Sequence, residues 1–269
     1  MAGALRAELL RRRTAGRRPG NPVERPTVLE LNGSPLVTLQ TTPVSLDDWA
    51  LGFLFAEGIV TGPEAIEHLT VHPAGAPPVV GTGFPVSAAL VRVQARPAPG
   101  WRPDLAGRRY LTSGCGRGVT FSSVFDAMSL RPVRRQVAPG RADLAAFAAR
   151  MQAAARLYEA TGGMHSAALV RLSDGDMVVR EDIGRHNAAD KVIGAALRRG
   201  WDPGGLVFLT SGRISYEMCA KLGRFGVAVG ASLTAATDLA VRLATRLGIT
   251  LVGYLGRRRP VVYTGGEWL

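Results

Sequence analysis

The segment LVFLTSGRISYEMCAKLGRFGVAVGAS, residues 206–232, decides the fold class of this 269-residue chain. Its first residues, Leu206–Leu209, form an apolar run that is typical of a buried strand. Residues 214–225 have the apolar spacing of a helix, and residues 227–232 are strand-like again. Sheets covered by helices are built from such units, in which a helix connects two buried strands. The segment therefore predicts an α/β fold.

The same alternation continues on both sides of this segment. A predicted hairpin and a helix precede it, and a helix and two strands follow it; these elements are expected over residues 165–172, 177–180, 187–199, 237–247, 249–255 and 261–264. An Ala-rich helix over residues 143–158, capped by Asp143, comes before them. We therefore expect residues 143–269 to form one α/β core.

The preceding part of the chain, residues 27–142, is predicted to be a smaller α+β unit. Its hairpin signal is Asn32-Gly33, which separates two strand-like runs. A largely apolar helix follows Ser45, a suitable capping residue, and Glu57 near its end is expected beside a packed surface. The strands of this unit are expected over residues 27–31, 36–40, 69–71 and 87–93, and a further short helix over residues 121–130.

The composition indicates a basic protein with a flexible start. Residues 1–26 are rich in Arg, Gly and Pro, which cannot build a core, so we expect a mobile tail. The net charge of +12 and the pI of about 11.0 indicate an anionic partner, such as nucleic acid, a phosphorylated cofactor or an acidic protein, or only a solvated basic surface. No apolar run is long enough to cross a bilayer. Two cysteines do not make a disulfide framework, which favours a cytoplasmic protein.

The loop Leu111–Gly118 holds the strongest chemical signal. Cys115 stands among three glycines and close to Arg117. Backbone amides and a fixed positive charge both favour the reactive thiolate over the thiol. We therefore infer a reactive Cys115; the alternative is a turn that contains a small, half-buried cysteine. Cys219 has helical spacing with apolar residues and is expected in the core.

Three predicted strand-to-helix turns carry side chains suited to anions. Helix starts and forked arginine donors attract phosphate, and ligands of α/β sheets collect at the carboxyl ends of strands. The alternative is three ordinary capped helices, with Asn187 and Thr237 as caps. The turns are Gly184–Lys191, with Arg185, His186 and Lys191; Thr210–Arg213, with Ser211 and Arg213; and Thr234–Asp238.

The four histidines give no metal signature. His68, His72, His165 and His186 belong to no His-x-Glu triplet, and the chain has no Cys-x-x-Cys. We expect no metal site and predict that His68 and His72 are a solvated loop pair. His165 begins an apolar strand and is either a hydrogen-bonded core histidine or a site residue.

Together these segments resemble the formate dehydrogenase accessory sulfurtransferase (FdhD) family. The resemblance implies a cytidine-deaminase-like mixed sheet covered by helices, with an additional N-terminal α+β part and no zinc site. The cysteine loop and the Gly-Arg-His-Asn segment are its most specific parts. The matching motifs run in the family's order from about residue 27 to the end: TP at 42–43, LGFLFAEGI at 51–59, SGCG at 113–116, TGGMH at 161–165, EDIGRHNAADK at 181–191, SGR at 211–213 and VYT at 262–264.

The resemblance also implies a function. Family members pass persulfide sulfur from a cysteine desulfurase to the molybdenum bis(molybdopterin guanine dinucleotide) cofactor, before its insertion into formate dehydrogenase, and are often dimeric. The persulfide cysteine falls on Cys115, with Arg117 expected to stabilise its thiolate. Guanine nucleotides should bind as fragments of the cofactor. The family's cofactor-binding stretch falls on Pro260, Val261, Val262, Tyr263, Thr264 and Gly265, and the turn residues Arg185, His186, Lys191, Ser211 and Arg213 are further candidates for holding the cofactor.

One position departs from the family pattern. Many members carry Cys-x-x-Cys in the loop, whereas the fourth position here is Gly118. A single persulfide carrier does not need a second cysteine, because sulfur passes by direct thiolate attack. Two alternatives stay open: a chaperone that binds the cofactor and moves no sulfur, and, less favoured, a nucleic-acid-binding protein whose affinity falls steeply with salt.

Overall fold

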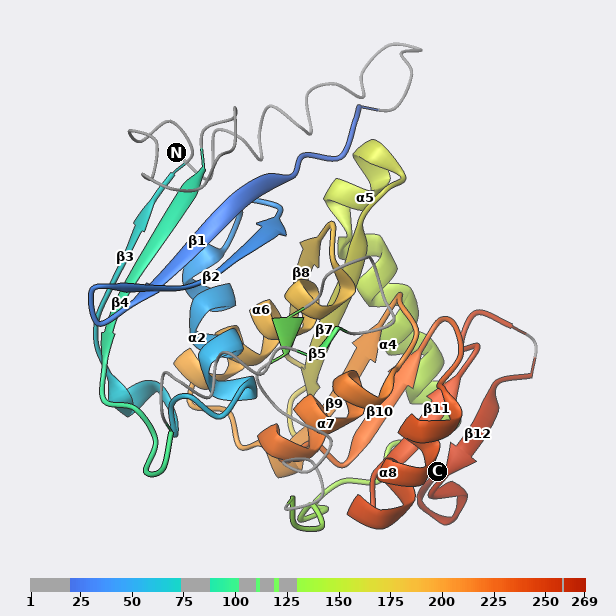
Figure 1. Ribbon diagram of the computed structural model, residues 1–269. Coiled ribbons are helices and arrows are strands. Elements are labelled where there is room, and N and C mark those ends of the chain that lie inside the picture. The colour runs from blue at the N-terminus through green and yellow to red at the C-terminus, as the bar shows by residue number, and fades with distance from the viewer. Residues whose placement is uncertain (1–19, 74–87, 102–109, 112–118, 121–129, 258) are drawn as a thin grey trace.

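The computed structural model describes residues 20–73, 88–101, 110–111, 119–120, 130–257 and 259–269. In this part of the chain the strands form a six-stranded sheet, a four-stranded sheet and a ribbon of β5 (Tyr110–Leu111) and β6 (Val119–Thr120). Figure 1 shows the two larger sheets with helices packed around them, so the predicted mixed α/β architecture is confirmed. The cysteine loop at 112–118 and residues 121–129 of the predicted short helix lie outside the described residues.

The large sheet is built from the second half of the chain. Its strand order is β12-β11-β10-β9-β7-β8; the central β9, β10 and β11 are parallel, and the other pairs are antiparallel. Every strand predicted between residues 165 and 264 is present. Their bounds are β7 (His165–Arg171), β8 (Met177–Asp182), β9 (Leu206–Thr210), β10 (Val229–Ser232), β11 (Thr250–Gly253) and β12 (Val261–Thr264).

Helices cover both faces of the large sheet. On one face, α6 (Arg185–Arg198), α7 (Tyr216–Phe225) and α8 (Asp238–Leu247) pack on strand residues such as Leu169 and Phe208. On the other face, α4 (Arg141–Ala154) packs on their strand neighbours, such as Val170 and Leu209. Because successive strand residues point to opposite faces, a sheet covered on both sides needs strands that are apolar throughout. This explains the continuous apolar runs in the sequence.

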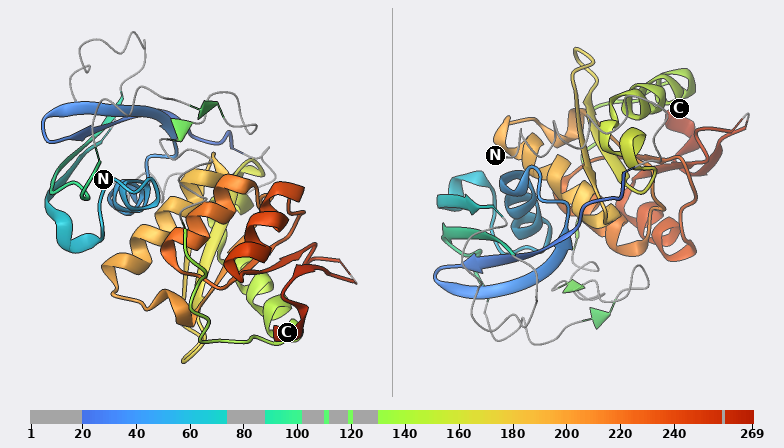
Figure 2. Two further views of the ribbon diagram at one scale, coloured as in Figure 1. Left: turned by 60° about the horizontal axis from the view of Figure 1, so that its bottom comes forward. Right: turned by 90° about the horizontal axis from the view of Figure 1, so that it is seen from above.

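The small sheet has the strand order β2-β1-β4-β3, and α2 (Leu46–Ala56) covers one of its faces (Figure 2). Asn32 and Gly33 have φ values of 51° and 81°, as a tight hairpin turn of this kind requires. The predicted hairpin is therefore confirmed. The remaining bounds are β1 (Arg25–Leu31), β2 (Ser34–Thr41), β3 (Ile66–His72) and β4 (Ala89–Ala95), with short 3-10 turns at Pro63–Ala65, Pro203–Gly205 and Gly266–Trp268.

Two segments differ from their predicted form. The helix predicted over 143–158 is broken at Ala155, whose ψ of 72° leaves the helical region, and continues as α5 (Arg156–Thr161). The Glu181 carboxylate accepts hydrogen bonds from the amides of Leu157 and Tyr158 at the start of α5. The predicted loop pair His68 and His72 lies on strand β3.

The predicted helix caps have mixed outcomes. Thr237 caps α8, since its hydroxyl accepts a hydrogen bond from the Ala240 amide. Ser45 precedes α2, but its side chain makes no capping bond. Asp143 lies in the first turn of α4 and accepts from the Gly140 amide at 3.0 Å. Asn187 is not a cap, because α6 already begins at Arg185.

The two sheets are joined through a close contact between α2 and α6. A Cβ on Gly52 of α2 would overlap the carbonyl oxygen of Asp190, and a Cβ on Gly194 of α6 would overlap that of Asp48. Only glycine lets the two backbones come this close. Figure 2 shows α2 lying between the small sheet and α6.

A buried ion cluster reinforces this contact. Lys221 Nζ of α7 lies 2.6 Å from Asp190 Oδ1 and 3.2 Å from Glu57 Oε1, and all three residues are buried. Glu57 therefore has the packed position expected from the sequence. Burial raises the pKa of Asp190 to about 6, with Lys221 opposing the change and Glu57 adding to it. As the pH falls below about 6, protonation of Asp190 leaves Lys221 with Glu57 as its other acidic partner.

No helix in the described part of the chain has the length and apolar character needed to cross a membrane.

Candidate functional site

The carboxyl ends of β8, β9, β10 and β11 lie along one edge of the large sheet, next to the start of β7 at His165. All three predicted turns follow strands that end at this edge. Several hydrogen bonds connect the turns after β9 and β10; among them, Ser232 Oγ donates to the Gly212 carbonyl at 2.7 Å, and the Leu233 amide donates to the Thr210 carbonyl at 3.0 Å. The edge is the natural candidate site in an α/β sheet.

Arg185 is the most unusual side chain at this edge. It is the first residue of α6 and only 8% exposed, yet its Nε is buried without a hydrogen-bond partner. Among the described residues no carboxylate pairs with its guanidinium. The side chain runs along Gly212, where an added Cβ would lie 3.0 Å from Arg185 Cβ. Buried charges are normally paired, so this arginine is suited to an external anion.

His165 lies beside Arg185 and belongs to the same edge. Its Nδ1 is 3.4 Å from Ser211 Oγ, and the Ser211 hydroxyl also accepts from the Ser166 amide at 2.9 Å. Burial and the charge of Arg185 lower the pKa of His165, with Asp182 opposing the change. His165 is therefore a neutral imidazole at neutral pH, held beside the buried guanidinium of Arg185.

His186 is a second neutral imidazole on α6. Its Nε2 lies 3.4 Å from the hydroxyl of Ser215, the residue that caps α7. Burial lowers the pKa of His186 to about 3, and the positive charges of Lys221 and Arg185 add to the effect. Neither histidine competes with Arg185 for an anion by charge.

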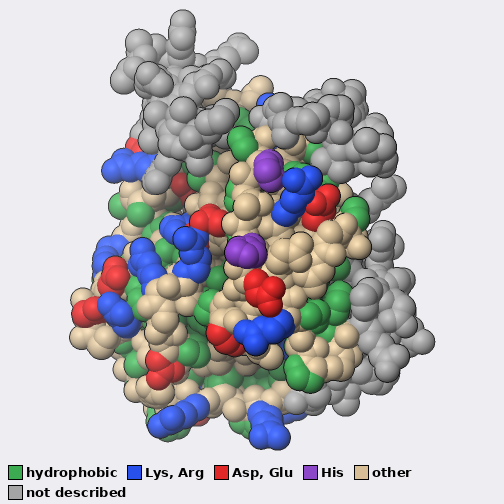
Figure 3. Space-filling model, turned by 90° about the vertical axis from the view of Figure 1, so that its left-hand side faces the viewer, with side chains coloured by type: hydrophobic (Ala, Val, Ile, Leu, Met, Phe, Trp, Pro, Cys, Tyr) green, Lys and Arg blue, Asp and Glu red, His purple; other side chains and the backbone are tan. Residues whose placement is uncertain are grey.

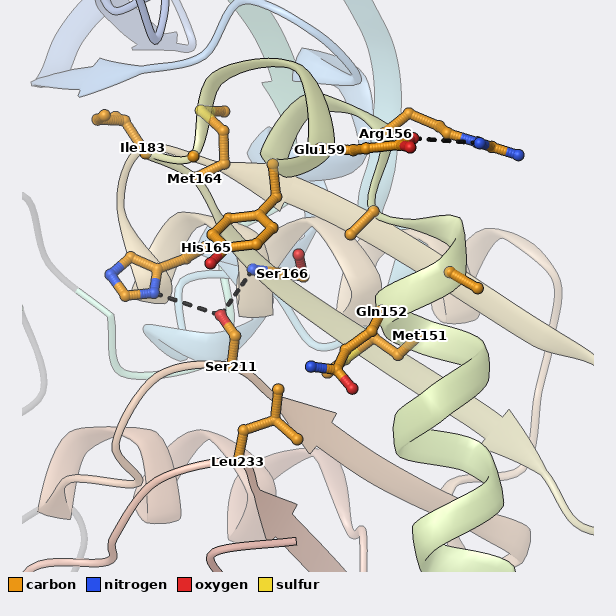
Figure 4. A pocket seen from close by; sticks show the side chains of 15 residues that line it. Met151, Gln152, Arg156, Glu159, Met164, His165, Ser166, Ile183, Ser211 and Leu233 are labelled. Carbon is orange, nitrogen blue, oxygen red and sulfur yellow. Dashed lines mark hydrogen bonds and ion pairs between the residues drawn. The ribbon is translucent and has the colours of Figure 1, made fainter. Parts of the chain in front are cut away.

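A cavity of about 1160 Å³ opens between this edge and the helices α4 and α5. In Figure 4, His165 and Ser211 lie on one side of it, and Met151 and Gln152 of α4 lie on the opposite side. Tyr158 of α5 also lines the cavity and is 53% exposed, although it is a large aromatic residue. Sequence reasoning missed this helical wall, since nothing in the Ala-rich segment marks it as part of a site.

The predicted turn residues have different environments. Ser211 lines the cavity and Arg185 adjoins it, whereas Arg213 is exposed at the surface. Lys191 does not fit its predicted role as a phosphate ligand, because it is fully buried. Its Nζ lies 2.6 Å from Asp182 Oδ2 and also donates to the carbonyls of Thr42 and Glu181. Three protein acceptors use the three ammonium hydrogens, so Lys191 holds the small sheet against β8.

The segment Pro260–Gly265 occupies the far side of the same sheet. Val261 pairs with Gly253 at the carboxyl edge, whereas Thr264 pairs with Leu251 farther along and donates to the Ile249 carbonyl. Three strand spacings, roughly 14 Å, separate β12 from β9. The Tyr263 ring packs over Gly253 and on the helix-covered core, so part of it serves packing. The segment and Arg185 are therefore at separate parts of one edge.

Of the two cysteines, only Cys219 lies in the part of the chain that the structure describes. Cys115 and its neighbour Arg117 lie outside the described residues. Cys219 is fully buried on α7, and burial raises the pKa of its thiol to about 12. The predicted core position of Cys219 is confirmed, and its thiol is unsuited to nucleophilic chemistry.

Two observations bear on the predictions about nucleic acid and metal ions. Figure 3 shows a face on which basic and acidic side chains are interspersed. Among the described side chains on that face there is no continuous basic stripe of the kind that marks a nucleic-acid-binding surface. Within the described residues, no three His, Cys, Asp or Glu side chains are grouped in a way that could hold a metal ion.

Comparison with known proteins shows similarity over nearly the whole chain. Residues 22–269 match the pattern of the FdhD/NarQ family. The "Sulfur carrier protein FdhD" of Anaeromyxobacter sp. (strain K) is 37% identical over 287 residues, which cover 100% of this chain and 94% of that protein. The protein of that name from Mycobacterium tuberculosis is 39% identical over 251 residues, with coverage of 91% and 90%.

A solved structure has the same fold. It is the crystal structure of a candidate formate dehydrogenase accessory protein from Desulfotalea psychrophila, which is 25% identical and superposes with a TM-score of 0.69. The match covers 93% of this chain and 90% of that one. Similarity over this length includes both sheets.

Proposed function

We propose, from the premise that this chain belongs to the FdhD/NarQ family, that it is a cytoplasmic sulfur carrier that supports formate dehydrogenase. Its substrates are the persulfide of a cysteine desulfurase and the molybdenum bis(molybdopterin guanine dinucleotide) cofactor. The observation that carries the proposal is the full-length similarity to proteins named as sulfur carriers, combined with the single glycine-flanked cysteine of this chain, Cys115.

The sulfur-loading step needs only one cysteine. The Cys115 thiolate attacks the terminal sulfur of the desulfurase persulfide, a new S–S bond forms on Cys115, and the desulfurase cysteine leaves as a thiolate. The step transfers a neutral sulfur atom and needs no external oxidant or reductant. Gly118 in place of a second loop cysteine is compatible with this chemistry.

Cofactor binding is the second half of the proposal. The cofactor has two nucleotide arms with pyrophosphates, and the carboxyl edge of the large sheet offers Arg185, Ser211 and Arg213 for one of them. The start of the Pro260–Gly265 segment lies farther along the same edge and is proposed to contact another part of the cofactor. We also propose a homodimer, as the resemblance implies.

The loading step is tested by substituting each cysteine in turn. We expect wild-type protein incubated with a cysteine desulfurase and cysteine to gain 32 Da on Cys115 by mass spectrometry, the mass of one sulfur atom. Cys115→Ala should gain nothing and should not support formate dehydrogenase, whereas Cys219→Ala should load normally, because its thiol is buried and protonated. A Cys115→Ala protein that still activates the dehydrogenase would favour a chaperone that moves no sulfur.

A further inference from the structure

The short helix α5 forms one wall of the cavity, through Arg156, Tyr158 and Glu159, and has little buried surface of its own. Of its six residues only Leu157 and Ala160 are buried. The Leu157 side chain packs in a small hydrophobic cluster that is separate from the clusters of the two sheets. Elements with few buried apolar contacts open at a lower free energy than core elements. This wall of the cavity is therefore suited to movement.

Both ends of α5 have a backbone conformation that interrupts the helix. At Ala155 a ψ of 72° separates α5 from α4, and at Gly162 a φ of 70° ends α5 in the left-handed region that favours glycine. Hinges are commonly a few residues at the ends of elements that absorb a backbone rotation. The second of these positions is three residues before His165, so a rotation there takes place next to the candidate site.

A carboxylate of the large sheet holds the first turn of α5. The Glu181 side chain of β8 accepts hydrogen bonds from the Leu157 amide at 2.9 Å and from the Tyr158 amide at 2.7 Å. These two bonds join α5 to another element, so they break when α5 moves away, whereas the bonds within α5 move with it. Exchange of these two amide hydrogens with solvent therefore reports the movement.

The start of the described chain lies beside α5 (Figure 1). We call residues 20–24 the strap. The Gly20 amide donates to the Ala160 carbonyl at 3.2 Å, and Val23 belongs to the small cluster under α5. Pro22 lies against the turn that follows α5, because a Cβ added to Gly163 would be 2.4 Å from Pro22 Cγ. The strap thus contacts both α5 and its second hinge.

Thr42 connects the strap to the cavity. It belongs to the TP pair at 42–43 and is fully buried. Its hydroxyl donates to the Val23 carbonyl at 3.0 Å and accepts from the Ile183 amide at 3.1 Å. Because Ile183 lines the cavity, one hydroxyl group fixes the strap and the cavity wall relative to each other.

We infer that α5 is a lid on the cavity, hinged at Ala155 and Gly162 and held closed by Glu181 and the strap. An open lid exposes the part of the carboxyl edge that carries His165 and Ser211, which lie on the cavity wall in Figure 4. In the proposed sulfur carrier the lid determines when the cofactor enters and leaves this edge, and in this respect alone the inference rests on the proposed function.

The first test locks the lid with a disulfide. Pro22→Cys and Gly163→Cys are combined in a Cys115→Ser background, which removes the competing loop thiol. The Cβ positions are 3.6 Å apart, within the range of about 3.5–4.5 Å that a disulfide requires. Oxidation should slow the exchange of the Leu157 and Tyr158 amides, followed by NMR, about tenfold, and reduction should restore it. The reduced protein is the matched control.

The second test releases the lid and measures access to the cavity. Ser166 lines the cavity and is 4% exposed, so Ser166→Cys in the Cys115→Ser background places a thiol behind the lid. Adding Glu181→Ala should raise the rate at which iodoacetamide modifies that thiol about tenfold. Glu67→Ala, which removes an exposed glutamate of β3, should leave the rate unchanged. Cys219 is fully buried in the same molecule and reports global unfolding.

Two outcomes would overturn the lid. One is an oxidised protein in which the two amides exchange as in the reduced form. The other is modification of the Ser166→Cys thiol that rises only together with that of Cys219, because the opening would then be global unfolding. Neither readout involves sulfur transfer or the cofactor. A wild-type protein that passes both tests but takes up no sulfur on Cys115 would refute only the carrier, and one that takes up sulfur but fails them would refute only the lid.

Discussion

At the scale of single residues, the site combines two imidazoles that stay neutral with a buried arginine that has no carboxylate partner among the described residues. Burial and positive neighbours hold the pKa of His186 at about 3 and lower that of His165. The groups that act on His165 are Arg185 at the start of α6, Asp182 at the end of β8 and Ser211 after β9. Protonating either ring would place a second positive charge beside Arg185, and this repulsion helps to keep both rings neutral.

These lowered pKa values predict a pH dependence of stability. In the unfolded chain His186 takes up a proton as the pH falls through about 6.5, whereas in the folded chain it does so only near 3. Between these values the unfolded state binds more protons. For this group the free energy of unfolding therefore decreases by about 1.4 kcal/mol for each pH unit by which the pH is lowered. Urea unfolding of His186→Gln between pH 6 and 4 should show a slope shallower by about that amount.

The control for this prediction is His68→Gln, which changes an exposed histidine of β3. Its slope should match that of the wild type. Asp190, whose raised pKa gives a slope of opposite sign between about 4 and 6, is present in all three proteins and cancels from the comparison. Identical slopes in wild type and His186→Gln would show that the His186 ring is protonated in the folded state as easily as in the unfolded one.

At the scale of elements, the sequence shows the strands more clearly than the helix ends. The apolar runs and the Asn32-Gly33 turn depend on local chemistry, so both were predictable. The break at Ala155 has no local signal in the sequence, because the start of α5 is held by Glu181, which lies on strand β8. Asn187 was predicted to be a cap, but its amide instead donates to the Gln40 carbonyl and to Asp182. Such partners come from tertiary contact alone.

The candidate site likewise has parts that the sequence predicts and parts that it does not. The three strand-to-helix turns could be located from sequence, since each follows a strand and carries Arg, Ser or Thr. The cavity wall from α4 and α5 could not, because its side chains are ordinary helix residues. Lys191 was misassigned because a scarce lysine beside Arg185 and His186 has the composition of a ligand site. Its partner Asp182 lies on the other side of the turn, and both side chains are fully buried.

The buried ion cluster where α2, α6 and α7 meet predicts a large loss of stability when its one cation, Lys221, is removed. Lys221→Met leaves Glu57 and Asp190 buried together without an ammonium, so we expect a loss of about 3–5 kcal/mol in the free energy of unfolding. Asp190→Asn keeps an oxygen acceptor for Lys221 and balances one ammonium with one carboxylate, so it should cost about 1 kcal/mol or less. Urea titration at pH 7 measures both; equal losses would contradict the charge-balance argument.

At the scale of the whole molecule, the chain start connects the small sheet to the cavity wall. The Gly20 amide donates to the Ala160 carbonyl of α5 at 3.2 Å, and the Val23 carbonyl accepts from Thr42 Oγ1 at 3.0 Å. Val23 also packs with Leu157 and Met164, next to the cavity. The predicted tail boundary at residue 26 is therefore too late, since contacts with the fold begin at Gly20 and β1 begins at Arg25.

This arrangement predicts that two truncations a few residues apart differ sharply. Removing residues 1–19 deletes six arginines but none of the contacts above, so both the melting temperature and guanosine diphosphate affinity should stay at wild-type values. Removing residues 1–24 also deletes the Val23 packing and two hydrogen bonds, at a cost of about 2 kcal/mol, and should lower the melting temperature by roughly 4–8 °C. It should also weaken the binding of guanosine diphosphate, because α5 loses its contacts with Gly20 and Val23. Differential scanning calorimetry and isothermal titration measure the two effects. If the shorter deletion alone weakened binding, the arginine-rich start and not the Arg185 site would supply the attraction for the nucleotide.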